Sequence, residues 1–335
     1  MAERLRIGIV GTGLKTLEYT PSWMALPGVS IPAAADPSAR AREKFCDVFD
    51  QISAPRPACF ESLAELLTAK RAELDMIYLA TPHAFHGADA LAVVESGLDL
   101  LLEKPMVATQ AEAEALSAAS EISNSTVVVA YQGGLSPLMQ ETCKRIQAGD
   151  FGQLISIAGN IWEPWKTQYA GHWKHDPKIS CGGFMFDTGA HLMNTVCLLA
   201  GQEFDRLSAF QNFHGLDIDI TTAVAGQLKD GTTVTLNAAG HAARACGSQI
   251  TLFFDRTTVS IDAWGQWVEI ETPGNETQRR NAEILDSPLL TFREVVAGKQ
   301  TNPSPISQGL RVAKLWDAIR TSAQQGGAVC SIDAS

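Results

Sequence analysis

The feature that most constrains the fold is an alternation, over the first 150 residues, between short apolar runs and segments with a helical pattern. The apolar runs occupy residues 5–10, 29–35, 74–80, 98–102 and 126–131 and are typical of buried parallel strands. Helical patterns lie at residues 86–96, 110–121 and 137–148. Strands that alternate with helices form a parallel sheet through right-handed crossovers. The sequence therefore predicts an α/β fold with a doubly wound parallel sheet.

A glycine-rich turn follows the first apolar run directly. Its sequence, Gly11-Thr12-Gly13-Leu14-Lys15-Thr16, fits the dinucleotide-binding pattern G-x-G-x-x-G except that threonine replaces the last glycine. The first two glycines permit a tight turn and a close approach of a pyrophosphate to a helix N-terminus. Thr16 is expected to loosen the packing of this helix on its strand slightly. We therefore expect a Rossmann domain over residues 1–132, with cofactor contacts from Gly11, Thr12, Gly13, Leu14 and Lys15.

The second apolar run ends at Asp36, where an acidic side chain can select the cofactor. A carboxylate at this point accepts both hydroxyls of an adenosine ribose and repels a 2′-phosphate, so NAD is favoured over NADP. Arg40 and Arg42 lie close by and keep NADP possible. Asp36-Pro37-Ser38 also has the pattern of a helix N-cap with proline at the first helical position. The two roles of Asp36 are compatible.

The pattern changes after residue 150 and predicts a second domain over residues 133–335. β-like runs occupy residues 154–162, 206–213, 221–228, 232–239, 248–254, 259–261 and 267–270, and helical patterns at residues 288–297 and 307–322 close the chain. This indicates an α+β domain with a large, mostly antiparallel, open-faced sheet. Helices would cover one face and leave the other for a subunit partner, which predicts a homodimer or homotetramer. The last helices could also pack back on the first domain.

A polar pair lies inside an apolar segment of this second domain. Residues 184–199 suit a buried helix that ends at Gly201, yet they include Asp187 and His191. Side chains four residues apart share one face of a helix. A carboxylate that holds one imidazole nitrogen leaves the other as an oriented proton acceptor. Taken alone, the segment is equally compatible with a helix that turns a polar face to solvent.

Composition excludes several functional classes. The 335 residues carry a net charge of −11, and the pI near 5.1 argues against a nucleic-acid or anionic-membrane partner. No apolar run approaches the roughly 20 residues of a membrane span. The charged N-terminus leads straight into a strand, without the apolar region of a signal peptide. The seven cysteines are scattered without a C-x-x-C pair, so we expect reduced thiols, no metal site and a cytoplasmic protein.

Four ordered motifs give the chain a resemblance to a known family. They are Gly11-Thr12-Gly13, Ala80-Thr81-Pro82-His83-Ala84-Phe85-His86, Glu103-Lys104-Pro105, and the segment from Gly182-Gly183 through Asp187 to His191. Over nearly its whole length the chain resembles the glucose–fructose oxidoreductase, inositol dehydrogenase and rhizopine-catabolism family (Gfo/Idh/MocA). The resemblance implies a Rossmann domain plus an open-faced sheet domain. It also implies NAD(P)-linked oxidation of a secondary hydroxyl of a sugar, sugar derivative or cyclitol, or reduction of the corresponding ketone.

The resemblance further implies roles for individual residues. Lys104 matches the lysine of the family's E-K-P motif and would stabilise charge on the reacting oxygen. An isolated lysine is more often a solvated surface charge, but a lysine directly after an apolar strand and before a proline favours the functional role. His191 matches the acid/base position, and Asp187 matches its orienting partner or a contact to a substrate hydroxyl. Glu103 would fix Lys104 or face the nicotinamide ribose. Thr81, Pro82, His83 and His86 would lie along the cofactor, although a histidine at a helix N-terminus is often a partly buried cap.

The chain departs from the family pattern where a substrate would bind. His83 stands where asparagine is usual, Cys181 stands where glycine is usual, and Gln132 is followed by two glycines without the arginine or asparagine of many members. Lys174 replaces the arginine of an arginine-x-aspartate-proline segment. These differences do not change the type of reaction that the resemblance implies, but they leave the identity of the substrate undetermined.

Aromatic and basic side chains gather in the segment of residues 162–175. Tryptophan rings pack against the C–H faces of sugars, but structural tryptophans in a loop core or an interface are as common. Both roles, sugar stacking and structural packing, remain open. For sugar stacking, Trp162 or Trp173 is favoured over Trp165. His172 and Lys174 could bind a carboxylate or a polyol. The candidate substrate contacts are Lys104, Gln132, Trp162, Trp165, His172, Trp173, Lys174, Asp187 and His191.

The leading functional hypothesis is an NAD-dependent dehydrogenase or reductase, with NADP possible, that acts on a small carbohydrate-like molecule. One alternative is a glycosidase of the same fold that retains its NAD and works by transient oxidation. Another is a non-catalytic regulator that senses sugars or nucleotides. Such regulators typically lose the lysine or the aspartate/histidine pair, and Lys104, Asp187 and His191 are all present here.

Overall fold

A computed structural model describes residues 4–283 and 287–332 of the chain. The chain forms two compact units, and each unit consists of two separate stretches of the sequence. The first unit comprises residues 1–130 and 287–306, and the second comprises residues 131–286 and 307–335. The first boundary between the units lies two residues before the expected one, and residues 287–306 return to the first unit.

The first unit contains the expected parallel sheet. Its six strands are β1 (Leu5–Val10), β2 (Val29–Ala35), β3 (Ala58–Phe60), β4 (Met76–Leu79), β5 (Asp99–Leu102) and β6 (Val127–Val129). Their order is β3-β2-β1-β4-β5-β6, and every pairing is parallel. The strand order reverses beside β1, which is where ligands bind in sheets of this class. The doubly wound fold predicted from the alternating pattern is thus confirmed.

The first unit also contains helices, several of which begin at short polar side chains that accept backbone hydrogen bonds. The helices are α1 (Leu14–Met24), α2 (Ala39–Gln51), α3 (Leu63–Lys70), α4 (His83–Glu95), α5 (Gln110–Ser123) and α12 (Pro288–Val296), with a 3₁₀ turn η1 at Arg71–Glu73. Thr109 and Glu112 form a reciprocal capping box at the start of α5. Helix α4 begins three residues earlier than predicted, immediately after Pro82.

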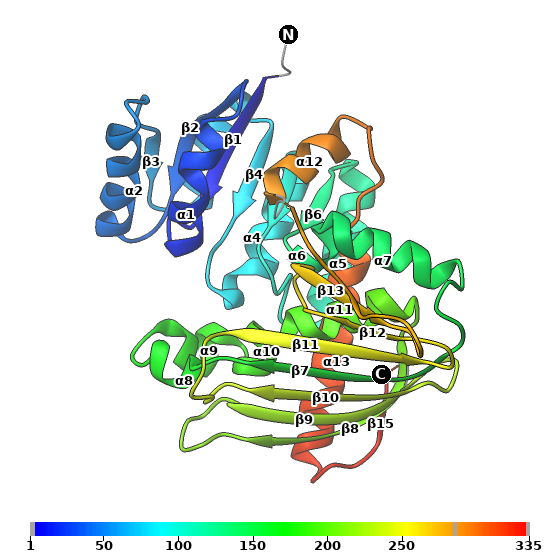
Figure 1. The fold of residues 1–335 in the computed structure, drawn as a ribbon. Coiled ribbons are helices and arrows are strands. Elements are labelled where there is room, and N and C mark those ends of the chain that lie inside the picture. The colour runs from blue at the N-terminus through cyan, green and yellow to red at the C-terminus, as the bar shows by residue number, and fades with distance from the viewer. Residues whose placement is uncertain (1–3, 284–286, 333–335) are drawn as a thin grey trace. The chain divides into compact units, whose positions relative to one another are not determined.

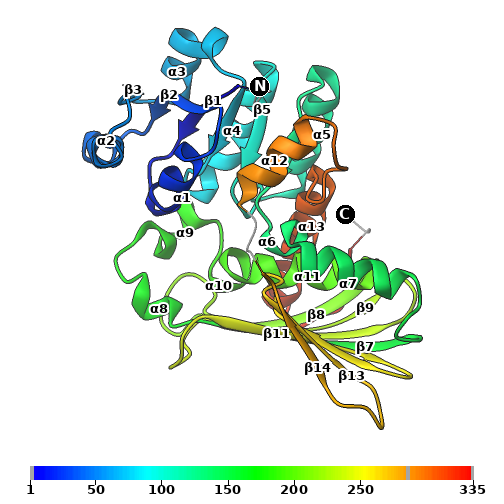
Figure 2. The same cartoon turned by 45° about the horizontal axis from the view of Figure 1, so that its top comes forward.

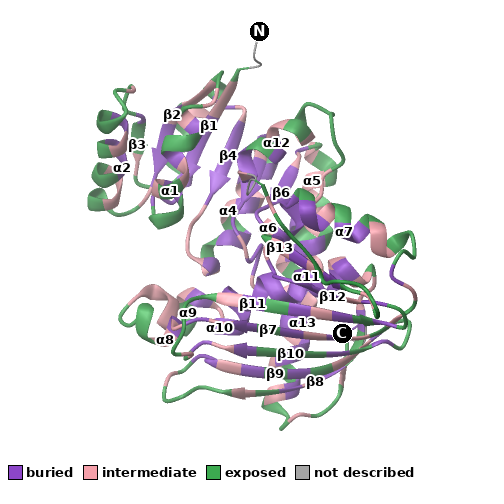
Figure 3. Ribbon diagram, viewed as in Figure 1, coloured by how far each residue is buried: buried purple, intermediate pink, exposed green. Residues whose placement is uncertain are grey.

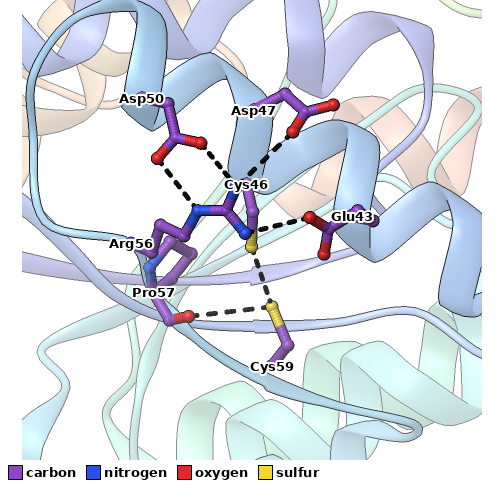
Figure 4. Close-up of polar contacts among 7 residues, drawn as sticks. All are labelled: Glu43, Cys46, Asp47, Asp50, Arg56, Pro57 and Cys59. Carbon is purple, nitrogen blue, oxygen red and sulfur yellow. Dashed lines mark hydrogen bonds and ion pairs between the residues drawn. The ribbon is translucent and has the colours of Figure 1, made fainter.

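Strand β3 was not predicted from the sequence, and contacts with α2 hold it at the sheet edge (Figure 4). Arg56, just before the strand, pairs with Glu43, Asp47 and Asp50 of α2. The sulfur atoms of Cys46 and Cys59 lie 3.5 Å apart. The strand is three residues long and little buried. A run this short falls below the length of about four to eight residues at which an apolar run predicts a strand.

Residues 287–306, which return to the first unit, cover the edge of the sheet at β6. The amide of Val129 on β6 donates to the carbonyl of Ser304 at 2.9 Å, and the Asn302 side chain donates to the carbonyl of Val127 at 2.7 Å. Trp23 of α1 donates to the hydroxyl of Ser287 at 2.9 Å. The segment of residues 287–306 therefore covers backbone groups that an edge strand would otherwise expose.

The second unit is built on a nine-stranded sheet (Figure 1). The strands are β7 (Leu154–Trp162), β8 (Phe204–Asn212), β9 (Thr221–Leu228), β10 (Thr233–Ala239), β11 (Gly247–Phe254), β12 (Thr258–Ile261), β13 (Trp267–Glu271), β14 (Gln278–Asn281) and β15 (Cys330–Ser331). Their order is β14-β13-β12-β11-β7-β10-β9-β8-β15. The β7–β10 pairing is parallel and the other pairings are antiparallel. The mostly antiparallel sheet is as predicted.

Helices cover one face of this sheet (Figure 2). The helical elements are α6 (Gln132–Leu135), α7 (Pro137–Gln147), α8 (Trp165–Gln168), η2 (Trp173–His175), α9 (Pro177–Ser180), α10 (Phe184–Asp187), α11 (Gly189–Ala200) and α13 (Ile306–Gln324). A side chain at Gly159 of β7 would collide with Leu192 of α11, so glycine permits the close contact of helix and sheet. Helix α13 joins the same layer, because Trp316 stacks on Phe186 of α10 with ring centroids 5.2 Å apart.

The opposite face of the sheet carries a central row of small, uncharged side chains, with the exposed Phe210 and Phe253 beside it. Along the central strands buried and exposed residues alternate, as Figure 3 makes visible. One row across five strands consists of Ser208, Ala225, Thr235, Ala158 and Thr251. Among residues 4–283 and 287–332, no helix is long and apolar enough to cross a membrane. In the same ranges, no cluster of three histidine, cysteine or acidic residues is placed to hold a metal ion.

Candidate active site

The glycine-rich turn between β1 and α1 has the geometry that a dinucleotide needs. Gly11 has a φ of +90°, and a Cβ atom there would lie 2.5 Å from the carbonyl oxygen of Ala80. A Cβ at Gly13, which precedes the first turn of α1, would meet nothing within 4 Å. Thr16 is buried, and its hydroxyl donates to the carbonyl of Gly11 at 2.6 Å. Thr16 therefore ties the helix to the turn, where the sequence suggested a looser packing.

Asp36 holds the same turn from the end of β2. One carboxylate oxygen accepts from the amide of Thr12 at 2.9 Å and from its hydroxyl at 3.1 Å. The other oxygen accepts from the amide of Ser38 at 2.9 Å. Ser38, not Asp36, is the N-cap of α2, because its hydroxyl accepts from the amide of Ala41. The expected cap is thus displaced by two residues, and Pro37 precedes the helix.

Basic residues near the turn already have partners or face solvent. Arg42 donates to the carbonyl of Asp36 at 2.6 Å and pairs with Glu61 at 3.3 Å. Lys15 pairs with Glu18 at 2.9 Å. Arg40 is exposed, and so is the apolar Leu14 at the start of α1, which is 69% accessible. Arg42 is therefore engaged away from a ribose phosphate, while Arg40 lies on the surface of α2.

His86 joins the loops that follow β4 and β5. Its Nε2 lies 2.7 Å from the carbonyl of Thr81, and its Nδ1 lies 2.8 Å from the carbonyl of Pro105. Burial lowers the pKa of His86, while the two carbonyls act in the opposite direction. His83, the first residue of α4, is also buried and packs edge-on against His86. Because His86 is buried and bridges two loops, it is more than a partly exposed cap.

Glu103 fixes the backbone beside Lys104. Its carboxylate accepts the phenol of Tyr78 at 2.9 Å and the amide of Lys104 at 3.3 Å. Burial raises the pKa of Glu103, and the positive charge of Lys104 and the Tyr78 hydrogen bond oppose this rise. Tyr78 lies on β4 in contact with Trp23 and has no distinctive local signal in the sequence.

In the second unit the predicted helix of residues 184–199 is interrupted between its two polar residues. Helix α10 ends at Asp187, and α11 runs from Gly189 to a C-cap at Gly201 with a φ of 61°. His191 is buried in the first turn of α11, and its ring packs against Trp264 and Tyr131 with centroid distances of 5.7 and 6.3 Å. Both polar side chains face the interior, so the solvent-exposed alternative is wrong.

Asp187 is held by two donors from the loop after β7. Its Oδ2 accepts from the indole Nε1 of Trp165 at 2.8 Å and from Nζ of Lys174 at 2.6 Å. The Trp165 ring is buried and packs against Tyr169, His175 and Phe184. Trp165 therefore positions a carboxylate, and its ring faces are covered by protein, which corrects its prediction as a stacking surface for sugar.

Two further buried acids hold the ends of α10, and neither was predicted from the sequence. Asp219 accepts from the amides of Gly183 at 2.7 Å and Met185 at 2.9 Å and so caps the helix from a distant segment. Burial raises the pKa of Asp219, opposed by these backbone hydrogen bonds. Glu163 accepts from the hydroxyl of Thr188, between the two helices, at 2.9 Å. A clue was present for Asp219, which lies between two isoleucines in an apolar stretch.

The remaining candidate residues of the second unit lie in three places. Trp162 is on the face of β7 opposite to Ile161, beside Gly247 and under the guanidinium of Arg244 at 4.3 Å. It therefore points away from the helices that carry Asp187 and His191. His172 and Trp173 lie partly exposed beside Lys174, and burial together with Lys174 lowers the pKa of His172. Gln132 begins α6 and is partly exposed.

Comparisons with known proteins agree with this architecture. Residues 5–131 match a family model described as "Oxidoreductase family, NAD-binding Rossmann fold", and residues 139–260 match the "GFO/IDH/MocA C-terminal domain". The fold and its paired domains thus define a two-domain oxidoreductase with an NAD-binding Rossmann fold. The chain belongs to the Gfo/Idh/MocA family.

Individual relatives are distant in sequence. A glycosyl hydrolase family 109 protein of Saccharopolyspora erythraea is 28% identical over 196 residues, which are 56% of this chain and 42% of that protein. A levoglucosan dehydrogenase of Pseudarthrobacter phenanthrenivorans is 24% identical over 214 residues, which are 62% of this chain and 54% of that protein. The matches span about half the length of these curated relatives. A crystal structure of an inositol dehydrogenase homologue with NAD⁺ from Azotobacter vinelandii has a TM-score of 0.84 at 19% identity, covering 99% and 98% of the two chains.

Proposed function

We propose that the protein is an NAD-dependent oxidoreductase that oxidises a secondary hydroxyl of a sugar, sugar derivative or cyclitol, or reduces the corresponding ketone. The observation that carries the proposal is the retention, in a chain of this family, of the turn held by Asp36 together with Lys104, Asp187 and His191. The relatives named for levoglucosan and D-xylose oxidation support a carbohydrate substrate.

The residues of the first unit suit NAD. The open space at Gly13, the amide-lined start of α1 and the acid at Asp36 fit a pyrophosphate and an unphosphorylated ribose. Bound NAD would supply the hydride acceptor at nicotinamide C4. Thr81, His83 and Glu103, at the ends of neighbouring parallel strands, would line the rest of the cofactor. NADP is disfavoured because its 2′-phosphate would meet the carboxylate of Asp36.

Lys104 and His191 have separate duties in the proposed reaction. When hydride leaves a carbinol carbon, negative charge develops on its oxygen, and the ammonium of Lys104 would stabilise that charge. His191 would accept the hydroxyl proton, oriented by Asp187 or by the substrate hydroxyl that Asp187 binds. In the opposite division of labour Lys104 is the base.

The pH dependence of kcat distinguishes these assignments. We expect Lys104→Met to lose most of kcat, by about 10²-fold or more, while NAD binding measured by fluorescence titration stays close to that of the wild type. The acid limb of the kcat profile should persist in Lys104→Met and disappear in His191→Ala. The reverse pattern would assign the base to Lys104.

A panel of sugars, inositols, sugar acids and glycosides with NAD and NADP, followed at 340 nm, tests the reaction class. We expect NADH formation with at least one neutral polyol. The alternative function is a glycosidase that retains NAD, favoured by the family 109 relative. Glycoside cleavage without net absorbance change at 340 nm would support that alternative.

The open face of the nine-stranded sheet is proposed as the subunit interface. Its central row of small, uncharged side chains carries no charge to desolvate, which suits a face-to-face association of two copies into a homodimer or, with a second interface, a homotetramer.

A further inference from the structure

The structure assigns Lys174 the role of a positioning residue that neutralises and orients Asp187, in place of the role of substrate ligand that the sequence suggested. This inference rests on the proposed function only for its catalytic consequence. The ion pair itself can be tested without turnover.

The carboxylate of Asp187 is buried. Only 2% of the Asp187 side chain is accessible, so its charge is nearly removed from water. Trp165 supplies one neutral hydrogen bond, and Lys174 supplies the positive charge at 2.6 Å on the same oxygen. A buried carboxylate is costly without an opposite charge close by, and the Lys174 ammonium meets this need.

Lys174 is itself held in place by its neighbours. Its ammonium lies 4.1 Å from the centroid of the Tyr169 ring, and 17% of its side chain is accessible. Its amide lies 3.5 Å from Nδ1 of His172 within the short η2 turn. A cation fixed between a carboxylate and an aromatic face has lost the mobility with which exposed lysines follow a ligand.

Neighbouring ionisable groups do not replace Lys174. The groups that act on the pair or its neighbours are His172 and His175 of η2, Tyr169 after α8, and Lys166 of α8. On the adjoining helices, Glu163 and Asp219 bind the ends of α10, and His191 lies in the first turn of α11. Burial lowers the pKa of both His172 and His175, which disfavours their charged forms. Lys166 donates to the carbonyl of His214, so Lys174 is the lysine whose ammonium contacts Asp187.

Loss of this cation changes the protonation of Asp187. In Lys174→Met the carboxylate stays buried without its counter-charge, so it will take up a proton at a higher pH than in the wild type. The folded protein then binds a proton that the unfolded chain has released, and stability is lost as the pH rises through that range. We expect the deficit in melting temperature relative to the wild type to grow as the pH rises.

A double-variant cycle isolates the charge pair. Asp187→Asn removes the charge that Lys174 balances, so Lys174→Met should cost much less stability in the Asp187→Asn background than in the wild type. Lys174→Arg keeps the charge and should retain most of the wild-type pH dependence. Lys166→Met is the matched control, because Lys166 lies in the same loop but donates to a backbone carbonyl, that of His214 at 2.6 Å.

Turnover provides the second readout. In Lys174→Met kcat should depend on the ionisation of Asp187 as well as on that of His191, so its acid limb should move to higher pH. Equal stability costs of Lys174→Met in the wild-type and Asp187→Asn backgrounds, or a raised KM with an unchanged pH profile, would overturn the assignment. If no substrate is turned over, the proposed function fails while the melting-temperature cycle still decides the role of Lys174.

Discussion

At the scale of single residues, Asp36 combines a structural and a selective role. Its carboxylate holds the amide of Thr12 in the glycine-rich turn, and the same group would meet the ribose of the cofactor. We expect the wild type to prefer NAD in kcat/KM. Asp36→Ser should narrow the ratio of NAD to NADP efficiency by about tenfold or more, because it removes both the repulsion of a 2′-phosphate and the ribose hydrogen bonds. Steady-state kinetics with both cofactors measure this ratio, and a wild type that prefers NADP would contradict the assignment.

Glu103 gives a prediction about pH and stability. Burial raises the pKa of its carboxyl group in the folded protein above the ordinary value of a glutamate, so the folded state retains a proton that the unfolded chain releases. Its contribution to stability is therefore present at low pH and is lost as the pH rises through the folded pKa. Glu103→Gln cannot ionise, so it avoids this loss of stability at high pH, and its amide oxygen can still accept the hydrogen bond of the Tyr78 phenol. Its melting temperature relative to the wild type should rise from pH 5 to pH 8 by roughly 2 °C.

The exposed Glu121 on α5 supplies the control for this measurement. Glu121→Gln should show the same pH dependence as the wild type, because its carboxylate stays in water in both states. If the difference in melting temperature between Glu103→Gln and the wild type does not change with pH, Lys104 and Tyr78 fully offset the effect of burial on the pKa of Glu103.

At the scale of elements, the four-residue helix α10 depends on a cap from outside its own sequence. Asp219 accepts the first amides of this helix, which have no partner within it. Asp219→Ala would leave these amides buried and unsatisfied, and we expect a loss of roughly 3 kcal/mol in the free energy of unfolding. Urea denaturation measures it. The exposed Asp217, two residues earlier, is the control, and Asp217→Ala should change stability by less than about 0.5 kcal/mol.

Elements with a strong hydrophobic period were predictable from the sequence, and irregular ones were not. Strands β7 and β9 have the predicted bounds, because alternation over eight or nine residues leaves little freedom. Strand β14 was missed, since Gln278–Asn281 is exposed throughout and has no apolar residue. Its place depends on pairing with β13, which is a tertiary contact.

The candidate site was predictable where a motif marks it. Spacing and motif marked Asp36, Lys104, Asp187 and His191 as candidates, and their roles stay predictions. Asp219 and Glu163 instead act through contacts at 36 and 25 residues' separation. No local pattern reports such contacts. The orientation of Trp162 also escaped prediction, because alternation along β7 separates two faces without telling which face the helices cover.

At the scale of the whole molecule, the open sheet face predicts the oligomeric state. We expect the wild type to be at least a dimer at micromolar concentrations by light scattering after gel filtration. Thr235→Glu places a charge in the central row of that face and should shift the protein to monomers. Ile122→Glu, on an exposed position of α5, should leave the mass unchanged. A monomeric wild type would argue against this interface.

The return of residues 287–306 to the first unit has a consequence for biosynthesis. A ribosome that has released the first 130 residues has not yet released Asn302 and Ser304, which hydrogen-bond to strand β6. Until they emerge, the last strand of the nucleotide-binding sheet keeps its backbone groups open to incorrect pairing. The unit that begins the chain is therefore among the last parts to be completed, and a fragment that stops after β6 would lack the residues that finish its own sheet.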